Sequence, residues 1–220
     1  ALKTFFSSVP PDTGLAFVVV VHLSPEHPSH LAELLQPQVR MPVQQVTETV
    51  PLQGGCVYVI PPGANLSAVD THLRLSDLEE ARRARAPIDH FFRTLAGTHD
   101  GHSIGVILSG TGSDGALGIK AIKEKGGLTI VQDPSEAEYD GMPQNAIASG
   151  LVDLILPLDR IADAIVRFAS TKPRLPALEE GDVERDELHL LQKTFAQLRA
   201  RTGRDFGSYK RSTILRRIQR

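Results

Sequence analysis

Short apolar runs alternate with amphipathic runs along most of the chain. Five nearly continuous apolar runs, rich in β-branched residues, predict buried strands: Leu15–Val21, Val57–Ile60, Ser103–Leu108, Leu128–Val131 and Leu151–Leu156. Strands that are apolar on both faces are typical of parallel sheets covered by helices. The segment Asn65–Ser76 differs, because apolar and polar residues alternate around Asp70-Thr71, and this pattern predicts an antiparallel hairpin.

Amphipathic runs fill the spaces between the predicted strands. They predict six helices: Ala1–Ser8, Ser29–Gln36, Ile88–Ala96, Gly115–Lys125, Gln144–Ala148 and Asp159–Ala169. Alternating strands and helices favour an α/β fold, a doubly wound and mainly parallel sheet that here also carries the antiparallel hairpin.

The pattern changes at Lys172, where prolines and a dense acidic stretch predict a linker over residues 172–185. A short helical segment follows, and from Arg199 to Arg220 it carries eight Lys or Arg against one acid, Asp205. We therefore divide the chain into residues 1–171, 172–185 and 186–220. Both ends lie within helix-like sequence, so we expect the chain to be a piece of a longer protein.

Composition narrows the possible functions. The chain has 220 residues, of which 41% are hydrophobic, enough for one substantial core. A net charge of -2 favours neither nucleic acid nor a membrane surface as a partner. The single cysteine, Cys56, excludes an internal disulfide framework and favours a reducing, cytoplasmic location. No apolar run approaches the roughly 20 residues of a membrane span, so we expect no membrane insertion.

A glycine-rich turn joins the third predicted strand to the next helix. Gly110, Gly112 and Gly115 spell G-x-G-x-x-G, and Asp133 lies 21 residues after Gly112, which is the spacing of a dinucleotide-binding fingerprint. Asp114 speaks against that interpretation, because it would place a carboxylate where the pyrophosphate binds. A second alternative makes Asp114 only a helix N-cap and the glycines only a tight turn.

Two reactive side chains follow predicted strands. His22 comes directly after Leu15–Val21, and Asp114 lies in the turn after Ser103–Leu108. Functional groups in doubly wound sheets gather at the carboxyl ends of strands, so the two side chains could meet there. A histidine base and an orienting carboxylate are two members of a nucleophilic triad. The turn adds backbone N–H groups that could hold a carboxylate or stabilise an oxyanion.

The third member of such a triad is missing from the sequence pattern. Ser109 and Ser113 flank the glycine turn, but they lie too close in sequence to Asp114 to be obvious nucleophiles. His27 and His30 follow His22, but no Cys or Asp completes a familiar zinc spacing. We therefore expect neither a metal nor a cofactor.

Several separate motifs resemble the CheB-type protein-glutamate methylesterase domain of bacterial chemotaxis. They are "VVVVHLSPEHPSHLAELL", "GGCVYVIPPGANL", "IGVILSGTGSDGALGIKAIKEKGG" and "TIVQDPSEAEYDGMPQNAIASGLVD", and the match runs from Ala1 to about Ser170. The resemblance places the family's histidine on His22 and its aspartate on Asp114. Its oxyanion position falls on Thr111, and the Gly112 N–H is a further candidate.

This resemblance implies a hydrolase of the chemotaxis phosphorelay. Its substrates would be glutamyl methyl esters on chemoreceptor cytoplasmic segments, and it would need no cofactor. The family's serine follows a first strand that, by family spacing, would lie upstream of Ala1. The resemblance therefore implies that residues 1–171 lack this strand and the nucleophile, and we expect the piece alone to be weakly stable and nearly inactive.

The end of the chain has its own resemblance. "TGRDFGSYKRSTILRRIQR" looks like the start of the CheR-type chemotaxis methyltransferase, and the similarity covers Asp186–Arg220. The whole chain would then be a slice of a methylesterase–methyltransferase fusion. Two other interpretations stay open at this point, namely a non-catalytic scaffold module of a signalling fusion and a dinucleotide-binding domain.

Overall fold

Nine strands form three small sheets in the computed structural model, which describes residues 1–76, 86–99 and 101–171. The predicted linker and the methyltransferase-like segment 186–220 lie outside the described residues. The strands are β1 (Phe17–Val19), β2 (Val43–Gln45), β3 (Val50–Pro51), β4 (Val57–Val59), β5 (Leu66–Val69), β6 (His72–Leu75), β7 (Ile104–Ile107), β8 (Leu128–Gln132) and β9 (Leu154–Leu156).

The helices come between these strands. They are α1 (Leu2–Ser8), α2 (Leu31–Leu35), α4 (Pro87–Thr98), α5 (Ala116–Glu124), α6 (Gly141–Ala148) and α7 (Leu158–Thr171), with short 3-10 helices η1 (Gln36–Gln38) and η2 (Pro134–Glu136). All six predicted helices are present, with ends displaced by up to three residues.

Two of the three sheets are wholly parallel. In one the order is β1-β4-β2, and in the other it is β7-β8-β9, so β4 and β8 are the central strands. The third sheet, β3-β6-β5, is antiparallel and contains the predicted hairpin. Asp70, at the tip of that hairpin, has a positive φ of 50°, which suits a tight β-turn. The prediction of a mainly parallel α/β fold with a hairpin is confirmed.

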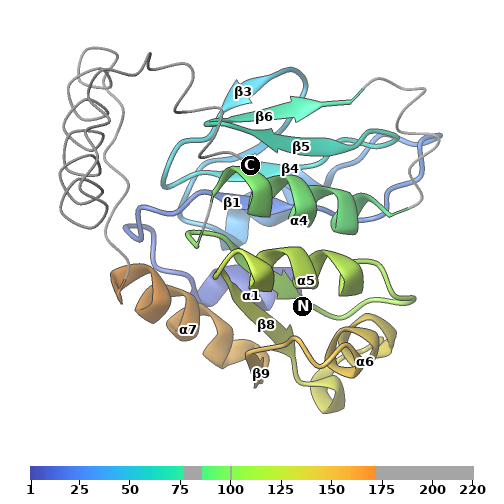
Figure 1. The fold of residues 1–220 in the computed structure, drawn as a ribbon. Helices are drawn as coiled ribbons and strands as arrows, with labels where there is room; N and C mark the ends of the chain where they lie inside the picture. The colour runs from blue at the N-terminus through green and yellow to red at the C-terminus, as the bar shows by residue number, and fades with distance from the viewer. Residues whose placement is uncertain (77–85, 100, 172–220) are drawn as a thin grey trace, which may run out of the picture. The chain divides into compact units, whose positions relative to one another are not determined.

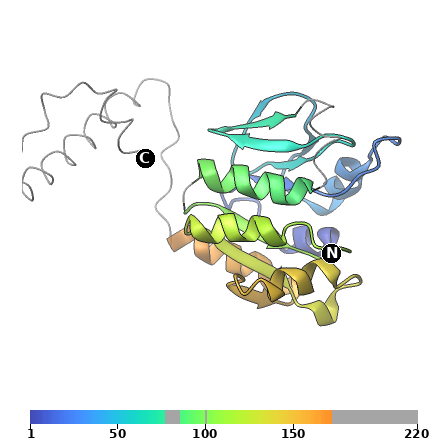
Figure 2. The same ribbon diagram turned by 45° about the vertical axis from the view of Figure 1, so that its right-hand side comes forward.

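Helices cover both faces of the parallel strands. On β4, Tyr58 packs in one apolar cluster with Phe92 of α4 and Ile119 of α5, whereas Val57 and Val59 pack in a second. The second cluster also contains Phe5 and Phe6 of α1 and Ile161 and Ile165 of α7. Figures 1 and 2 show α4 and α5 side by side, with the antiparallel sheet beyond α4. The strands are therefore doubly covered, as their continuous apolar sequence predicts.

Strands β1 and β7 are each an edge strand of one of the two parallel sheets. Each pairs with a neighbour on one side only among the described residues, β1 with β4 and β7 with β8. Both nevertheless contribute to the same apolar cluster, through Val19 on β1 and through Ile104 and Val106 on β7. The two parallel sheets thus share one core without a described hydrogen bond between them.

The predicted strands differ from the observed ones in three ways. β1 spans only Phe17–Val19 rather than Leu15–Val21, because its partner β4 has three residues and Pro61, which has no N–H, follows soon after. The β2 and β3 strands were not predicted at all, since Pro42 and Pro51 interrupt their pattern. The third failure concerns β9, which is three residues shorter than predicted.

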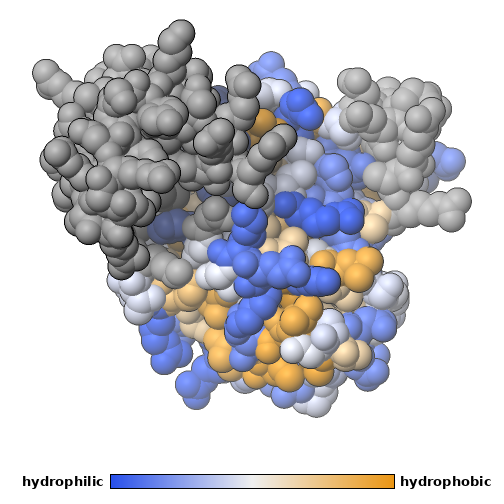
Figure 3. All heavy atoms as spheres, in the orientation of Figure 1, coloured by the Kyte–Doolittle hydropathy of each residue, from blue (hydrophilic) through white to orange (hydrophobic). Residues whose placement is uncertain are grey.

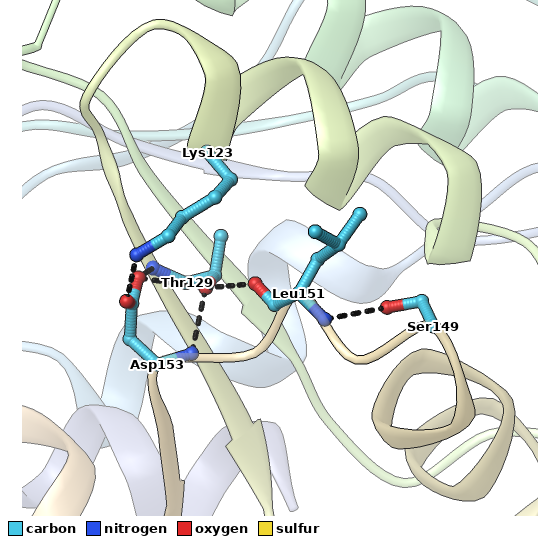
Figure 4. Close-up of polar contacts among 5 residues, drawn as sticks. All are labelled: Lys123, Thr129, Ser149, Leu151 and Asp153. Atoms are coloured by element: carbon cyan, nitrogen blue, oxygen red, sulfur yellow. Dashed lines mark hydrogen bonds and ion pairs between the residues drawn. The ribbon is translucent and has the colours of Figure 1, made fainter.

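Leu151–Asp153 is not a strand, because hydrogen bonds that involve the side chains of Thr129 and Asp153 connect this segment to β8. The Thr129 hydroxyl contacts the Leu151 carbonyl at 2.9 Å, and the Asp153 carboxylate accepts the Thr129 N–H at 3.0 Å (Figure 4). The Lys123 ammonium donates to the other oxygen of Asp153. We call these four residues the Asp153 latch.

The hydrogen bonds of the latch also lower the pKa of Asp153. Burial raises the pKa of Asp153, but the hydrogen bonds from Lys123 and Thr129 lower it by more, so its pKa lies below the ordinary value of 3.8. The latch therefore fixes β9 to β8 through a carboxylate that stays ionised well into acid.

Apolar side chains reach the surface beside the β7-β8-β9 sheet. Leu154 and Ile155 of the edge strand β9 are exposed, as is Tyr139 in the loop before α6. Figure 3 shows apolar surface in this lower part of the view, where Figure 1 draws β9 and α6. Among the described residues, no helix combines the length and the apolar character that crossing a bilayer requires.

Candidate active site

A cavity of about 530 Å³ lies where β1 and β7 end and where α4 and α5 begin. Its lining includes His22, Asp89, Thr111, Gly112, Asp114 and Asn145. The carboxyl ends of parallel strands are where ligands bind in folds of this class. Four of the six are the residues that the sequence nominates, so the fold brings every predicted site residue to one place.

His22 and Asp114 are in direct contact although 92 positions separate them in the sequence. The Nε2 atom of His22 lies 2.9 Å from Oδ2 of Asp114. The His22 side chain is 54% exposed, whereas that of Asp114 is 9% exposed. The carboxylate is thus the fixed partner, and the ring is the part that solvent and a substrate can reach.

The Asp114 carboxylate is held by the first turn of α4. Oδ2 accepts the Ile88 N–H at 3.0 Å, and Oδ1 accepts the Asp89 N–H at 2.9 Å. These N–H groups have no partner within their own helix, and the helix dipole favours a negative charge beside them. Asp114 is therefore a helix cap after all, but it caps α4 and not the helix that follows it, whose own N-cap is Gly115.

This contact determines which nitrogen of His22 is basic. A carboxylate can only accept, so the Nε2 atom that faces it carries the proton in the neutral ring. Nδ1 is then the unprotonated nitrogen, free to take a proton from a neighbouring hydroxyl. Pairing with a buried carboxylate fixes this tautomer, which is the role of the acid in a triad.

Two residues of the glycine turn, Thr111 and Gly112, line the same cavity as His22. Gly112 has φ of 84°, a left-handed conformation that suits glycine. Within the described part of the chain, the N–H groups of Thr111 and Gly112 donate to no acceptor. Asn145 of α6 connects its helix to the turn, because its amide donates to the Gly112 carbonyl at 3.0 Å and to the Gly141 carbonyl of α6 at 2.9 Å. The geometry suits stabilisation of a developing negative charge.

Asp133 and His30, on which a dinucleotide site and a metal site would depend, do not line this cavity. Asp133, the acid of the dinucleotide fingerprint, accepts from the N–H and hydroxyl of Ser135, and these bonds hold its pKa below the ordinary value. The cavity itself holds two carboxylates, those of Asp89 and Asp114, which would repel a pyrophosphate. His30 pairs with Glu33 at 2.8 Å. Over residues 1–76, 86–99 and 101–171, no group of three His, Cys, Asp or Glu is placed to hold a metal ion.

Comparison with known proteins identifies the family. A sequence profile described as CheB methylesterase matches residues 1–165. The chain belongs to the CheB methylesterase family. The catalytic domain of CheB methylesterase from Thermotoga maritima has a similar structure, with a TM-score of 0.66 and 26% identity, over 76% of this chain and 90% of that one.

Relatives of this CheB domain differ in length. A putative protein-glutamate methylesterase/protein-glutamine glutaminase of Leptospira interrogans is 36% identical over 169 residues, covering 76% of this chain and 88% of that protein. An uncharacterized 104.1 kDa protein of Rhodobacter capsulatus is 34% identical over 210 residues, covering 86% of this chain but 22% of that protein. The chain spans about half of the protein-glutamate methylesterase/protein-glutamine glutaminase of Geobacillus kaustophilus.

Sequence reasoning missed two residues that line the cavity, Asp89 and Asn145. Asp89 lies in the first turn of α4, a position where an acid is common for helix stability alone. Asn145 lies within α6, and its bonds to Gly112 and Gly141 depend on the way that α6 packs on the glycine turn. The only signal was the nearby "GMP", whose Met142 N–H bonds the Gly110 carbonyl at 2.8 Å.

Proposed function

We propose that this CheB domain hydrolyses glutamyl methyl esters on the cytoplasmic segments of chemoreceptors by a Ser-His-Asp mechanism. The observation that carries the proposal is the 2.9 Å contact between His22 and Asp114 inside the cavity. The names of the similar proteins from Leptospira interrogans and Geobacillus kaustophilus, which include protein-glutamate methylesterase, support the substrate class. We further propose that the protein acts in the cytoplasm.

The first half of the reaction forms an acyl-enzyme. The serine hydroxyl gives its proton to Nδ1 of His22 while its oxygen attacks the ester carbonyl carbon. The imidazolium that forms is stabilised by Asp114. The carbonyl oxygen becomes an oxyanion, to which the N–H groups of Thr111 and Gly112 donate. Collapse of this intermediate breaks the bond to the methoxy oxygen, which leaves as methanol with the proton from Nδ1.

The second half repeats these steps with water. A water molecule loses a proton to Nδ1 and attacks the acyl carbon. The new intermediate collapses, the serine oxygen takes the proton back from Nδ1, and the glutamyl side chain leaves as a carboxylic acid, which then releases its remaining proton to water. No step requires a cofactor.

We propose that the serine comes from a segment N-terminal to Ala1, at the end of a strand that joins the two parallel sheets. Two observations support this position. β1 and β7 each pair on one side only among the described residues, and their side chains share one core. On this proposal the 220-residue chain alone turns over little ester and melts at a low temperature.

We also propose that a CheR-type methyltransferase domain follows, beginning within residues 186–220. The similarity to the Rhodobacter capsulatus protein covers 86% of this chain, more than the residues 1–165 matched by the family profile, and that protein is much longer. This supports a multidomain parent protein.

The test measures methanol release from methylated receptor segments by the full-length protein and its His22→Ala variant. We expect loss of at least ~10³-fold in turnover, because the variant lacks the proposed general base. His72→Ala, which replaces an exposed side chain of β6, is the matched control and should retain full activity. Equal activity in the His22→Ala variant would refute the mechanism, and a wild-type protein without turnover would favour the scaffold alternative.

A further inference from the structure

The starts of α4 and α5 hold each other through two carboxylates. Asp114, just before α5, accepts N–H groups from the first turn of α4. In return, Oδ1 of Asp89 in α4 accepts the N–H of Gly118 in α5 at 2.6 Å. Each helix start therefore supplies the acceptor for N–H groups that the other leaves unpaired.

Asp89 is enclosed at this junction. The residue is 5% exposed, and its side chain lies on the wall of the cavity that holds His22. A Cβ atom at Gly118 would come within 3.0 Å of the Asp89 Cα and within 2.6 Å of the Phe92 Cβ. Only glycine allows the helices to approach closely enough for the short Asp89–Gly118 bond.

Asp89 is also bonded to the Asp114 carboxylate itself. Its backbone N–H donates to Oδ1 of Asp114, while its side chain anchors Gly118, four residues after Asp114. One residue thus fixes both the carboxylate and the helix that carries it. Loss of the Asp89 acceptor would release the start of α5 and let Asp114 move relative to His22.

We propose that Asp89 is a positioning residue that fixes the His22 tautomer through Asp114. Its catalytic consequence rests on the proposed esterase function, but its effect on the His22 ring does not. The feature that matters is the hydrogen-bond acceptor at position 89, because the bond to Gly118 is made to a neutral backbone N–H. An asparagine can supply the same acceptor, whereas an alanine cannot.

The first experiment measures the imidazole ¹⁵N shifts of His22 by NMR in this chain, with the His22→Ala spectrum used for assignment. Wild type and Asp89→Asn should show a protonated Nε2 and an unprotonated Nδ1 in the neutral ring. Asp89→Ala should show an averaged mixture of tautomers. Asp153→Ala, which removes a structural carboxylate of the latch, is the matched control and should keep the wild-type shifts despite lower stability.

Two results would overturn the proposal: unchanged His22 shifts in Asp89→Ala, or an equal disturbance in Asp153→Ala. Should Asp89→Ala fail to fold, Asp89→Glu carries the test, because it keeps the charge but displaces the acceptor by one methylene. It should disturb the His22 shifts, and wild-type shifts in that variant would equally refute the proposal.

The second experiment measures methanol release by the full-length protein. Asp89→Ala should lower kcat by about 10- to 100-fold with little change in KM, as expected for misplacement of a catalytic group. Asp89→Asn should stay close to wild type, and equal loss in both variants would contradict the acceptor role. Failure of the esterase proposal is recognised separately, because wild type would then release no methanol while the NMR difference persists.

Discussion

Two aspartates in this domain bind similar groups but have different consequences. Asp114 accepts two backbone N–H groups and the Nε2–H of His22, and Asp153 accepts a backbone N–H and a hydroxyl of Thr129 and the ammonium of Lys123. Both lie at the start or end of elements that they join. The difference is the third partner, since a lysine stays charged at neutral pH whereas a histidine can exchange a proton.

The surroundings sharpen this difference. His22 is 54% exposed and faces the cavity, so its second nitrogen is available for chemistry. The Asp153 latch lies at the β8–β9 junction and contributes no residue to that cavity. A carboxylate with several donors is therefore not in itself a sign of catalysis; what distinguishes Asp114 is an exchangeable partner that faces open space.

The comparison predicts its largest effect on turnover. In the full-length protein, Asp114→Asn should lower kcat for ester hydrolysis by about 10³- to 10⁴-fold, because the amide no longer fixes the tautomer of His22. Asp153→Asn should leave kcat close to wild type when rates are corrected for the folded fraction. Similar losses in the two variants would mean that the comparison is mistaken and that both aspartates act through stability.

Changes in the Asp153 latch should instead have their main effect on the free energy of unfolding. Thr129→Val keeps the volume of a fully buried side chain but removes the hydroxyl that contacts Leu151 and Asp153, so it should lower the free energy of unfolding by about 1–3 kcal/mol. Urea unfolding measures this quantity. Thr98→Val, at the exposed end of α4, is the control and should change it by less than about 0.5 kcal/mol. A neutral Thr129→Val would show that the latch is dispensable.

The smallest effect concerns pH. The pKa of Asp153 in the folded chain is lower than its ordinary value of 3.8, so the folded state favours the ionised form. The stabilisation is therefore fully present above about pH 4 and is lost as the pH falls through the lowered pKa. Melting curves of wild type and Asp153→Asn should converge between neutral and acidic pH. A stability difference that stays constant down to the acid limit would contradict this assignment.

The sequence predicted the parts of the site that follow from strand ends. His22 comes directly after one continuous apolar run and Asp114 lies in the turn after another, and topology alone brings such positions to one edge. It could not predict that Asp114 would cap α4, because Ile88 and Asp89 lie about 25 positions upstream and their approach depends on helix packing. The role of Asn145 was not predicted for the same reason, because its bond to Gly112 depends on how α6 packs on the glycine turn.

The fold was predictable to a similar degree. Nearly continuous apolar runs such as Leu128–Val131 were identified because burial on both faces leaves few polar positions in the strand. β2 and β3 were not predicted because they have only three and two residues, and because pairing with strands from other parts of the chain stabilises them. Leu151 was misassigned because its side chain packs against an apolar cluster while its carbonyl accepts from the Thr129 hydroxyl rather than pairing in a sheet.

The capping of α4 by Asp114 has a consequence for the time at which the site comes into being. His22 is synthesised early and α4 next, but the carboxylate that completes both follows only after β7 has been made. In a nascent chain that ends before Asp114, no carboxylate fixes the tautomer of His22, and the N–H groups of Ile88 and Asp89 at the start of α4 lack this acceptor. The contact between His22 and Asp114 can therefore form only after the chain beyond β7 has packed on the part that was made before it.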